Sequence, residues 1–225
     1  MGKDKLKKWA ENKTFDHVFE PPFEQAFKQE SELPGTWHER VFGNDHPITL
    51  ELGCGKGEYT VGLARMFPQR NFIGVDVKGH RFWRGARTAR EEELNNVAFV
   101  RARIEFITSF LGEGEVDEIW LTFSDPQPRN EKKRITGPAF IDRYKKFLKS
   151  GATIHIKTDN TGLYEWTLEQ LQEQGYEIEE HTPNVYGAYF ESLSPEWQQI
   201  MSIRTYYEQK FAEEGEKIKY IQFRI

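Results

Sequence analysis

The stretch ITLELGCGKGEYTVGLARMF (residues 48–67), followed by NFIGVD (71–76), decides the fold of this chain. Its first part, ITLELG (48–53), is short and apolar, which is typical of a strand buried on both faces. Glycines then lead into residues 57–67, whose apolar side chains share one helical face. Pro68 ends that helix, and the second apolar run begins at residue 71. The stretch therefore predicts a strand, a tight turn, a helix and a second strand, which is the first unit of a parallel α/β sheet.

Strand and helix patterns continue to alternate along the chain. We expect further strands at 97–102, 115–123, 151–159, 176–182 and 217–225, and helices at about 78–94, 138–149, 161–174 and 195–213. Because the strands are apolar, helices should cover both faces of the sheet, and ligands should bind beyond the carboxyl ends of the strands near the first one. We predict a doubly wound, mostly parallel α/β domain over residues 48–225.

Residues 1–47 differ from this pattern. They are polar, show no sustained period, and are interrupted by Pro21, Pro22, Pro34 and Pro47. We expect an N-terminal appendage that is partly ordered and contains a short helix or two.

The length of 225 residues, 37% of them hydrophobic, suits one domain with an appendage better than two separate cores. No apolar run approaches the roughly 18 residues of a membrane helix, and the basic start lacks the apolar stretch of a secretory signal. The single cysteine, Cys54, excludes an internal disulfide and a multi-cysteine zinc site. We expect a cytoplasmic protein without membrane contact or metal, and the sequence leaves monomer and homodimer both open.

Charge is distributed unevenly along the chain. The formal net charge is −5, which argues weakly against a nucleic-acid partner. However, residues 129–149 hold eight Lys or Arg against two acids, and residues 1–13 hold five Lys against two acids. Polyanion binding follows the local field within a Debye length of about 8 Å, so these segments favour a nucleic-acid partner. Scattered, solvated faces are the alternative interpretation.

The loop after the first strand has the composition of a cofactor-binding turn. Gly53 and Gly55 allow a ligand to approach the backbone without meeting a Cβ atom. A dinucleotide-binding fingerprint would place a further glycine at position 58, where Glu58 stands. The acid Glu51 would repel a pyrophosphate but suits a ligand that carries an ammonium and a sulfonium. This pattern favours S-adenosylmethionine over NAD. Asp76, at the end of the second strand, can accept hydrogen bonds from both ribose hydroxyls of either cofactor.

The segment SDPQP (124–128) follows the fourth strand, beside the point where the strand order reverses. Its two prolines fix φ and remove two donors, so the loop is stiff and carries one carboxylate, Asp125. Such a loop can hold a nucleobase against a methyl group. The phosphates that flank this base could be neutralised by Arg129, Lys132, Lys133 and Arg134. An ordinary turn followed by a solvated charge run is the alternative.

Five segments together resemble one family, the bacterial tRNA (guanine-N7-)-methyltransferases. They are VFGNDHPITLELGCGKGEY, NFIGVDVK, VDEIWLTFSDPQPRNEKKRI, HIKTDN and RTYYEQKF, which cover residues 41–225 in the expected order. The resemblance implies a Rossmann-like class I methyltransferase fold with a seven-stranded sheet and an antiparallel C-terminal strand. It also implies S-adenosylmethionine as methyl donor and N7 of the guanine at position 46, in the tRNA variable loop, as acceptor.

The resemblance assigns site residues by position. The cofactor acids of the family map onto Glu51 and Asp76, and its acid after the fourth strand maps onto Asp125. Its tRNA-facing residues map onto Arg129, Asp159, Thr205, Tyr206, Tyr207 and Glu208. Where the family commonly offers Asp or Asn to the adenine, this chain has Ala102, which suggests that a backbone amide or the neighbouring Arg103 makes that contact. Gln127 replaces a tryptophan, and the loop before the basic run is two residues shorter than usual.

We expect N7 of guanine to attack the donor methyl directly, because N7 carries a lone pair and no proton. Asp125 is the first candidate for the carboxylate that orients the base and favours the cationic product, with Asp159 or Glu208 as alternatives.

Three other classes of protein remain open. They are a methyltransferase acting on a different RNA or DNA base, a nicotinamide oxidoreductase, and a non-catalytic RNA-binding protein on the same fold.

Overall fold

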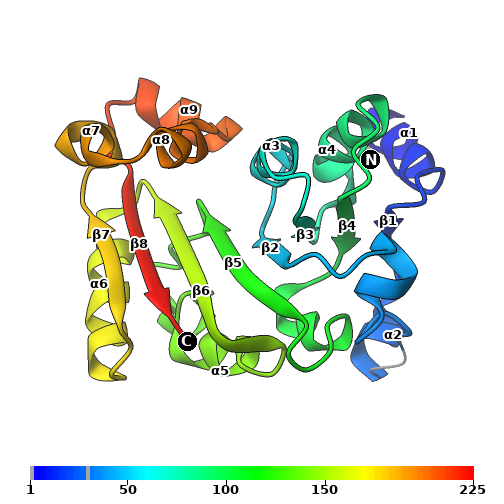
Figure 1. Cartoon of the computed structure of the whole chain (residues 1–225), viewed down its shortest axis with the longest axis horizontal. Coiled ribbons are helices and arrows are strands. Elements are labelled where there is room, and N and C mark those ends of the chain that lie inside the picture. Colours follow the sequence, from blue (N-terminus) through cyan, green and yellow to red (C-terminus); the bar gives the residue numbers. More distant parts are fainter. Residues whose placement is uncertain (1–2, 29–30) are drawn as a thin grey trace.

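Five apolar stretches form the parallel strands at the centre of one β-sheet. They are β2 (Ile48–Leu52), β3 (Asn71–Asp76), β4 (Val97–Arg101), β5 (Val116–Thr122) and β6 (Leu148–Thr158). Every residue of β2 and β3 is buried, because helices cover both faces of the sheet, and this burial explains the unbroken apolar runs. The computed structural model describes residues 3–28 and 31–225, and Figure 1 shows the sheet with its helices.

The sheet has the order β1-β4-β3-β2-β5-β6-β8-β7. β8 (Lys219–Arg224) runs antiparallel to both β6 and β7 (Ile178–Thr182), which confirms the prediction of a mostly parallel sheet with an antiparallel C-terminal strand. The eighth strand, beyond the seven expected, is β1 (Val18–Phe19), which pairs with β4 at the edge. Because the order reverses between β2 and β5, a crevice opens there at the carboxyl ends of the strands.

The helices form two groups, one on each face of the sheet. One core contains residues of α3 (Glu58–Met66), α4 (Gly79–Glu91) and α8 (Pro195–Ser202). The other contains residues of η2 (Ile104–Ser109), α5 (Pro138–Tyr144) and α6 (Thr161–Glu173). Successive strand residues alternate between the two cores, as Phe99 and Val100 do, because side chains of a strand point to opposite faces.

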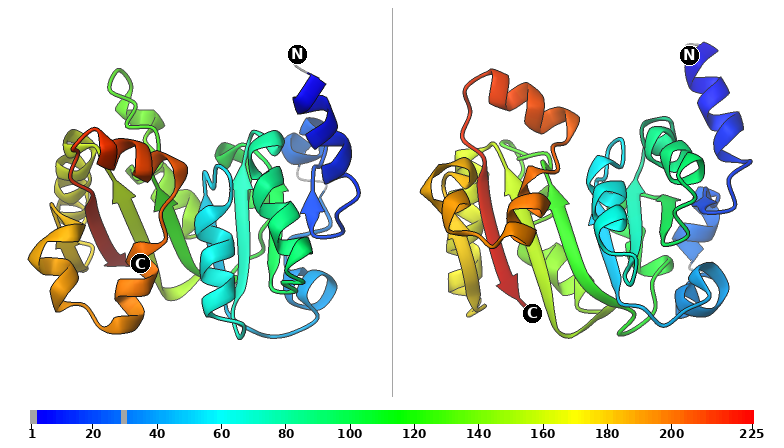
Figure 2. Two further views of the ribbon diagram at one scale, coloured as in Figure 1. Left: turned by 90° about the horizontal axis from the view of Figure 1, so that it is seen from above. Right: turned by 45° about the horizontal axis from the view of Figure 1, so that its top comes forward.

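The described part of the N-terminal segment, residues 3–28 and 31–47, packs against the domain and contains short helices. α1 (Lys3–Asn12) packs on α4, as Figures 1 and 2 show, and β1 extends the sheet. After α2 (Phe23–Lys28), the turn η1 (Trp37–Phe42) buries Trp37 completely. The indole of Trp37 donates a hydrogen bond to the carbonyl of Phe110 (2.7 Å), so this segment closes one face of the core.

The helix predicted at 195–213 is wrong as a single element. The chain forms α8 and then α9 (Tyr206–Glu213), separated by residues 203–205, after the short η4 (Val185–Tyr189) and α7 (Phe190–Ser192). The break has a local cause, because the hydroxyl of Thr205 accepts a hydrogen bond from the amide of Glu208 and so begins a new helix. The helix predicted at 138–149 ends earlier, at Tyr144, because β6 begins at Leu148 beside Val116.

Candidate active site

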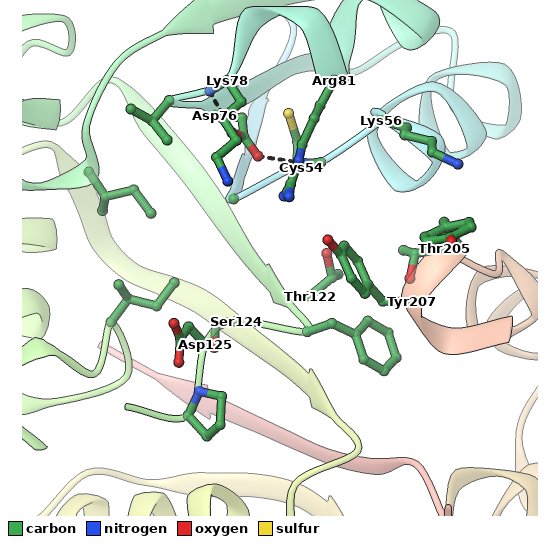
Figure 3. A pocket seen from close by; sticks show the side chains of 18 of the residues that line it. Cys54, Lys56, Asp76, Lys78, Arg81, Thr122, Ser124, Asp125, Thr205 and Tyr207 are labelled. Atoms are coloured by element: carbon green, nitrogen blue, oxygen red, sulfur yellow. Dashed lines mark hydrogen bonds between the residues drawn. The ribbon is translucent and has the colours of Figure 1, made fainter. Parts of the chain in front are cut away.

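A cavity of about 1070 Å³ lies at the carboxyl ends of the central strands, at the point where the strand order reverses. One wall comes from the loop after β2 and the end of β3, and the other comes from the loop after β5 together with α9. Figure 3 shows Cys54, Asp76 and Arg81 on the first wall, and Asp125 and Tyr207 on the second. The cavity lies beyond the carboxyl ends of the strands, where the alternation of strands and helices predicts that ligands bind.

The glycine loop presents bare backbone to the cavity. Gly53 (φ +82°) and Gly55 (φ +57°) both line it, and nothing lies within 4 Å of the place where a Cβ atom would stand on either. A side chain at these positions would strain the left-handed backbone and fill this open space. A ligand can therefore lie directly against the loop.

Asp76 is held rigidly at the end of β3. Its side chain is almost buried, and its two oxygens accept hydrogen bonds from the amide of Gly55 (3.1 Å) and the amide of Lys78 (2.7 Å), as Figure 3 shows. Each carboxylate oxygen has two lone pairs, so one acceptor position on each remains for a ligand. This carboxylate is ready to receive two hydroxyl groups without rearrangement.

Glu51, whose charge was expected to face the ligand, lies behind the wall of the cavity rather than on it. The side chain is buried, and it accepts hydrogen bonds from the amide and hydroxyl of Thr60 and from the hydroxyl of Thr122. Burial without a cation raises the pKa of Glu51 to about 7. Glu51 thus joins the start of α3 to the end of β5 and supports the glycine loop from beneath.

Ala102 and Arg103 follow β4 and both line the cavity. The backbone amide of Ala102 already donates a hydrogen bond to the carbonyl of Asp76 (3.3 Å), so it is not free for an adenine. The side chain of Arg103 is exposed and lies 3.5 Å from a carboxylate oxygen of Glu105. The amide of Ala102 is thus occupied, and Arg103 stays available to an adenine.

The loop after β5 carries an exposed carboxylate into the cavity. Asp125 lines the cavity, and its one hydrogen bond within the described residues comes from the amide of Gln127 (3.0 Å). Gln127, at the position that departs from the family, has a left-handed backbone (φ +46°) and also lines the cavity. Asp125 can therefore accept further hydrogen bonds from a planar donor edge.

The basic run of residues 129–149 does not form one surface. Arg129, Lys132 and Lys133 are exposed on the loop and on the turn η3 (Glu131–Lys133), and Lys133 reaches the cavity wall. Residues 143–149 lie instead at the end of α5 and the start of β6. This is the amino-terminal end of the parallel strands, opposite the cavity.

Arg134, which was expected to contact a phosphate, is nearly buried. Its guanidinium donates a hydrogen bond to the carbonyl of Pro126 (2.9 Å) and lies 4.4 Å from the ring centre of Trp166. Arg134 therefore fastens the loop to α6, and it is not available to solvent.

Of the expected tRNA-facing residues at the start of α9, three line the cavity and one, Glu208, does not. Thr205, Tyr206 and Tyr207 line the cavity, and the ammonium of Lys56 lies 3.8 Å from the ring centre of Tyr206. Asp159, at the end of β6, also lines the cavity, and partial burial raises its pKa. These residues form an aromatic and acidic rim opposite the glycine loop.

Glu208, which was expected to face the tRNA, is fully buried in this structure. Its carboxylate oxygens lie 3.1 and 3.2 Å from the ammonium of Lys157, which is also fully buried. Lys157 donates a further hydrogen bond to the carbonyl of Met201, and the hydroxyl of Tyr186 donates to Glu208. This ion pair attaches α9 to β6 and so sets the position of the aromatic rim.

Three residues in or beneath the site were not predicted from the sequence, although each lies in a segment that the sequence analysis covered. Lys56 lies inside the quoted glycine loop, and Arg81 lies on the helix of arginines that follows β3. Lys157 stands in the HIKTDN segment, but its partner is 51 residues away. Among the described residues, no group of three His, Cys, Asp or Glu could hold a metal ion, and no helix is long and apolar enough to cross a membrane.

Comparisons with known proteins identify relatives of this chain. Residues 45–221 match a family model described as "Putative methyltransferase". The chain is 48% identical over 225 residues to a tRNA (guanine-N(7)-)-methyltransferase of Bacteroides thetaiotaomicron, covering 100% of this chain and 87% of that one. It is 47% identical to the protein of that name from Christiangramia forsetii, covering 99% and 98%.

Solved structures share the fold at low sequence identity. The 16S rRNA methyltransferase KamB superposes with a TM-score of 0.64 at 14% identity, over 87% of this chain and 95% of that one. A SAM-dependent methyltransferase from Aquifex aeolicus gives a TM-score of 0.54 at 16% identity, over 89% and 98%.

Proposed function

This chain belongs to the tRNA (guanine-N7-)-methyltransferase family, and we propose that its cavity transfers a methyl group from S-adenosylmethionine to N7 of the guanine at position 46 of tRNA. The observation that carries the proposal is the pairing of two carboxylates across one cavity. Asp76 is held by backbone amides beside the glycine loop, and Asp125 is exposed on the loop that leads to a basic turn.

The residues of the first wall fit S-adenosylmethionine. The bare backbone at Gly53 and Gly55 leaves room for the ligand, and Asp76 keeps two acceptor positions, the number that the two ribose hydroxyls require. The acids Glu58 and Asp125 also line the cavity, which suits the positive sulfonium and ammonium groups. When bound, this cofactor supplies a methyl group on a positively charged sulfur.

The second wall suits a guanine. In the transfer, a bond forms between N7 and the methyl carbon as the carbon–sulfur bond breaks, and the positive charge moves onto the purine. Since N7 carries no proton, no side chain has to act as a base. Asp125 can accept hydrogen bonds from the N1–H and N2–H edge of the base, which orients N7 and stabilises the charge that develops on the ring.

The exposed cations beside Asp125 suit the phosphates that flank the guanine. Arg129, Lys132 and Lys133 stand on the same loop, immediately after the carboxylate. Contacts with phosphates position a nucleic acid without reading its sequence, so the choice of base falls to Asp125 and to the aromatic rim.

The decisive experiment maps modified nucleosides by mass spectrometry in unmodified tRNA after incubation with S-adenosylmethionine. We expect 7-methylguanosine at position 46, formed about 10²–10³ times more slowly by an Asp125→Ala variant. Methylation of a different base would favour the other RNA or DNA methyltransferase, and absence of any product, with tRNA bound, would favour a non-catalytic RNA-binding protein.

A further inference from the structure

A second positive surface lies on α1, on α4 with the residue before it, and at the end of β4, outside the loop after β5. It is formed by six side chains: Lys5, Lys8, Lys78, Arg81, Arg84 and Arg101. Four of them are exposed, and Lys8 and Arg81 are partly exposed. Within the described part of the chain, Lys8 is the one member with a carboxylate partner, Asp4, at 2.9 Å. We call this group the α1–α4 surface.

The charges of this surface meet around one imidazole. His80 stands in the first turn of α4, and burial together with the positive charges of Lys5, Arg81, Lys78 and Lys8 lowers its pKa. Arg84 is four residues further along the same helix, so it shares the face of His80. Arg101 lies over the ring of Trp9, whose edge contacts His80. The six cations are therefore close neighbours rather than scattered charges.

α1, which carries Lys5 and Lys8, is attached to α4 by side-chain hydrogen bonds. The indole of Trp83 on α4 donates a hydrogen bond to Glu11 (2.8 Å), and the amide of Asn12 donates to the carbonyl of Gly79 (3.0 Å). Lys8 also lies 4.8 Å from the ring centre of Trp83. Because α1 contacts α4 at both its middle and its end, the backbone that carries Lys5 and Lys8 is packed against the domain.

The α1–α4 surface is continuous with the cavity but lies on its far side from the basic loop. Lys78 and Arg81 line the cavity directly. α4 follows β3 and the basic loop follows β5, and β2 separates these strands in the sheet. Figure 2 shows α1 and α4 together on one side of the molecule, away from α9. A polymer that enters the cavity can therefore touch cations on both sides.

We propose that the α1–α4 surface binds backbone phosphates of the same tRNA whose guanine enters the cavity. The inference rests on the proposed function, since it requires an RNA at this site. A nucleic-acid strand continues in both directions from the target guanine, and the basic loop lies on only one side of the cavity. A fixed cluster of cations on the opposite rim supplies the second contact, and it acts through charge rather than through base recognition.

The test compares two variants with the same loss of charge. The first combines Lys5→Gln, Lys8→Gln and Arg84→Gln, which leaves the cavity wall unchanged. The matched control combines Lys145→Gln, Lys146→Gln and Lys149→Gln, which lie at or just before the start of β6, at the end of the sheet opposite the cavity. We would measure the Kd for tRNA between 50 and 300 mM salt, and the Kd for S-adenosylhomocysteine by calorimetry.

For the first variant we expect the slope of log K against log salt to fall by about 0.7–0.9 for each phosphate that is no longer neutralised, so by about 2 or more, with at least tenfold weaker binding near 100 mM salt. Binding of S-adenosylhomocysteine should stay within twofold of wild type. A slope and Kd equal to those of wild type, or an equal decrease in the control variant, would overturn the inference.

Two further measurements keep the outcome clear. The double variant Lys5→Gln, Arg84→Gln changes only exposed side chains without an ion-pair partner in the described structure, and it should show about two thirds of the change in slope. If wild type forms 7-methylguanosine and the variants bind tRNA normally, the surface inference fails while the proposed function stands. If wild type neither binds nor methylates tRNA, the proposed function itself fails.

Discussion

The two walls of the cavity hold their carboxylates by opposite means. Asp76 is almost buried and accepts hydrogen bonds from two backbone amides, whereas Asp125 is exposed on a loop and accepts one. A site fixed by backbone suits a small ligand of constant shape, because no rearrangement is needed on binding. An exposed side chain on a loop suits a large substrate that brings its own surface. In the function proposed above, a rigid cofactor site then lies beside an open RNA site.

The supports beneath the two walls also differ. Under the first, Glu51 is buried among hydroxyl and amide donors, and no cation is in contact with it in the described structure. Under the second, Glu208 is buried against the ammonium of Lys157. One support can become neutral by taking up a proton, and the other is neutral only as a pair. They should therefore respond differently to mutation and to pH.

The largest effect should follow removal of Lys157. A Lys157→Met variant leaves the carboxylate of Glu208 buried without its cation, which should lower the free energy of unfolding by about 3–5 kcal/mol. Urea unfolding measures this. Adding Glu208→Gln to the variant should recover part of the loss. The control Arg87→Gln breaks the exposed pair with Glu91 and should cost less than about 1 kcal/mol. Equal losses in the two single variants would contradict the distinction between the supports.

Next in size is the effect of Asp125 on the chemical step. An Asp125→Asn variant keeps the shape of the loop but loses the charge that favours the cationic purine, so kcat should fall by about 10²–10³. Single-turnover formation of 7-methylguanosine measures the step. Calorimetry should find the affinity for S-adenosylhomocysteine within a few-fold of wild type. Near-normal kcat would remove Asp125 from the reaction.

The pH dependence of stability should reveal Glu51. Since its pKa is about 7 in the folded chain and about 4.5 otherwise, the folded chain binds the extra proton between these values. The free energy of unfolding should therefore fall as pH rises from 4.5 to 7, by about 3 kcal/mol from this group. Glu51→Gln should remove that part of the slope, as unfolding curves across the pH range would show. Parallel pH profiles for wild type and variant would contradict the assignment.

The smallest effect should come from Asp76, and it should be opposite in kind to that of Asp125. Asp76→Asn replaces one acceptor oxygen by a donor, so it faces either the amide of Gly55 or that of Lys78 unfavourably. We expect the Kd for S-adenosylhomocysteine to rise about tenfold to a hundredfold, with kcat at saturating cofactor changed far less. A variant that lost kcat and kept cofactor affinity would reverse the roles of the walls.

Much of the sheet could be predicted from the sequence because buried parallel strands are apolar runs that end at glycines or acids. β2 and β3 were predicted to within one residue for this reason. The break between α8 and α9 could not be predicted. Residues 203–205 suit a helix, and the break depends on the hydrogen bond by which Thr205 caps the start of α9. β1 was missed because two residues carry no detectable period.

Side-chain exposure was the least predictable part of the site. Lys133 and Arg134 are adjacent and equally basic, yet one is exposed at the cavity and the other is nearly buried against Trp166. Glu208 lies in a segment that resembles the family, but its orientation depends on Lys157 in a distant strand. A local sequence pattern identifies such residues as important, and only the packing of α9 and α6 decides what they touch.

The bond from Arg134 to the carbonyl of Pro126 turns the intervening residues into a closed ring. Arg129, Lys132 and Lys133 all lie within this ring, and Asp125 is joined to it by a single peptide bond. A pull by RNA on any of these cations should therefore move the whole ring as one piece and carry Asp125 with it. Binding of the RNA phosphates by these cations would then also set the position of Asp125 relative to the guanine.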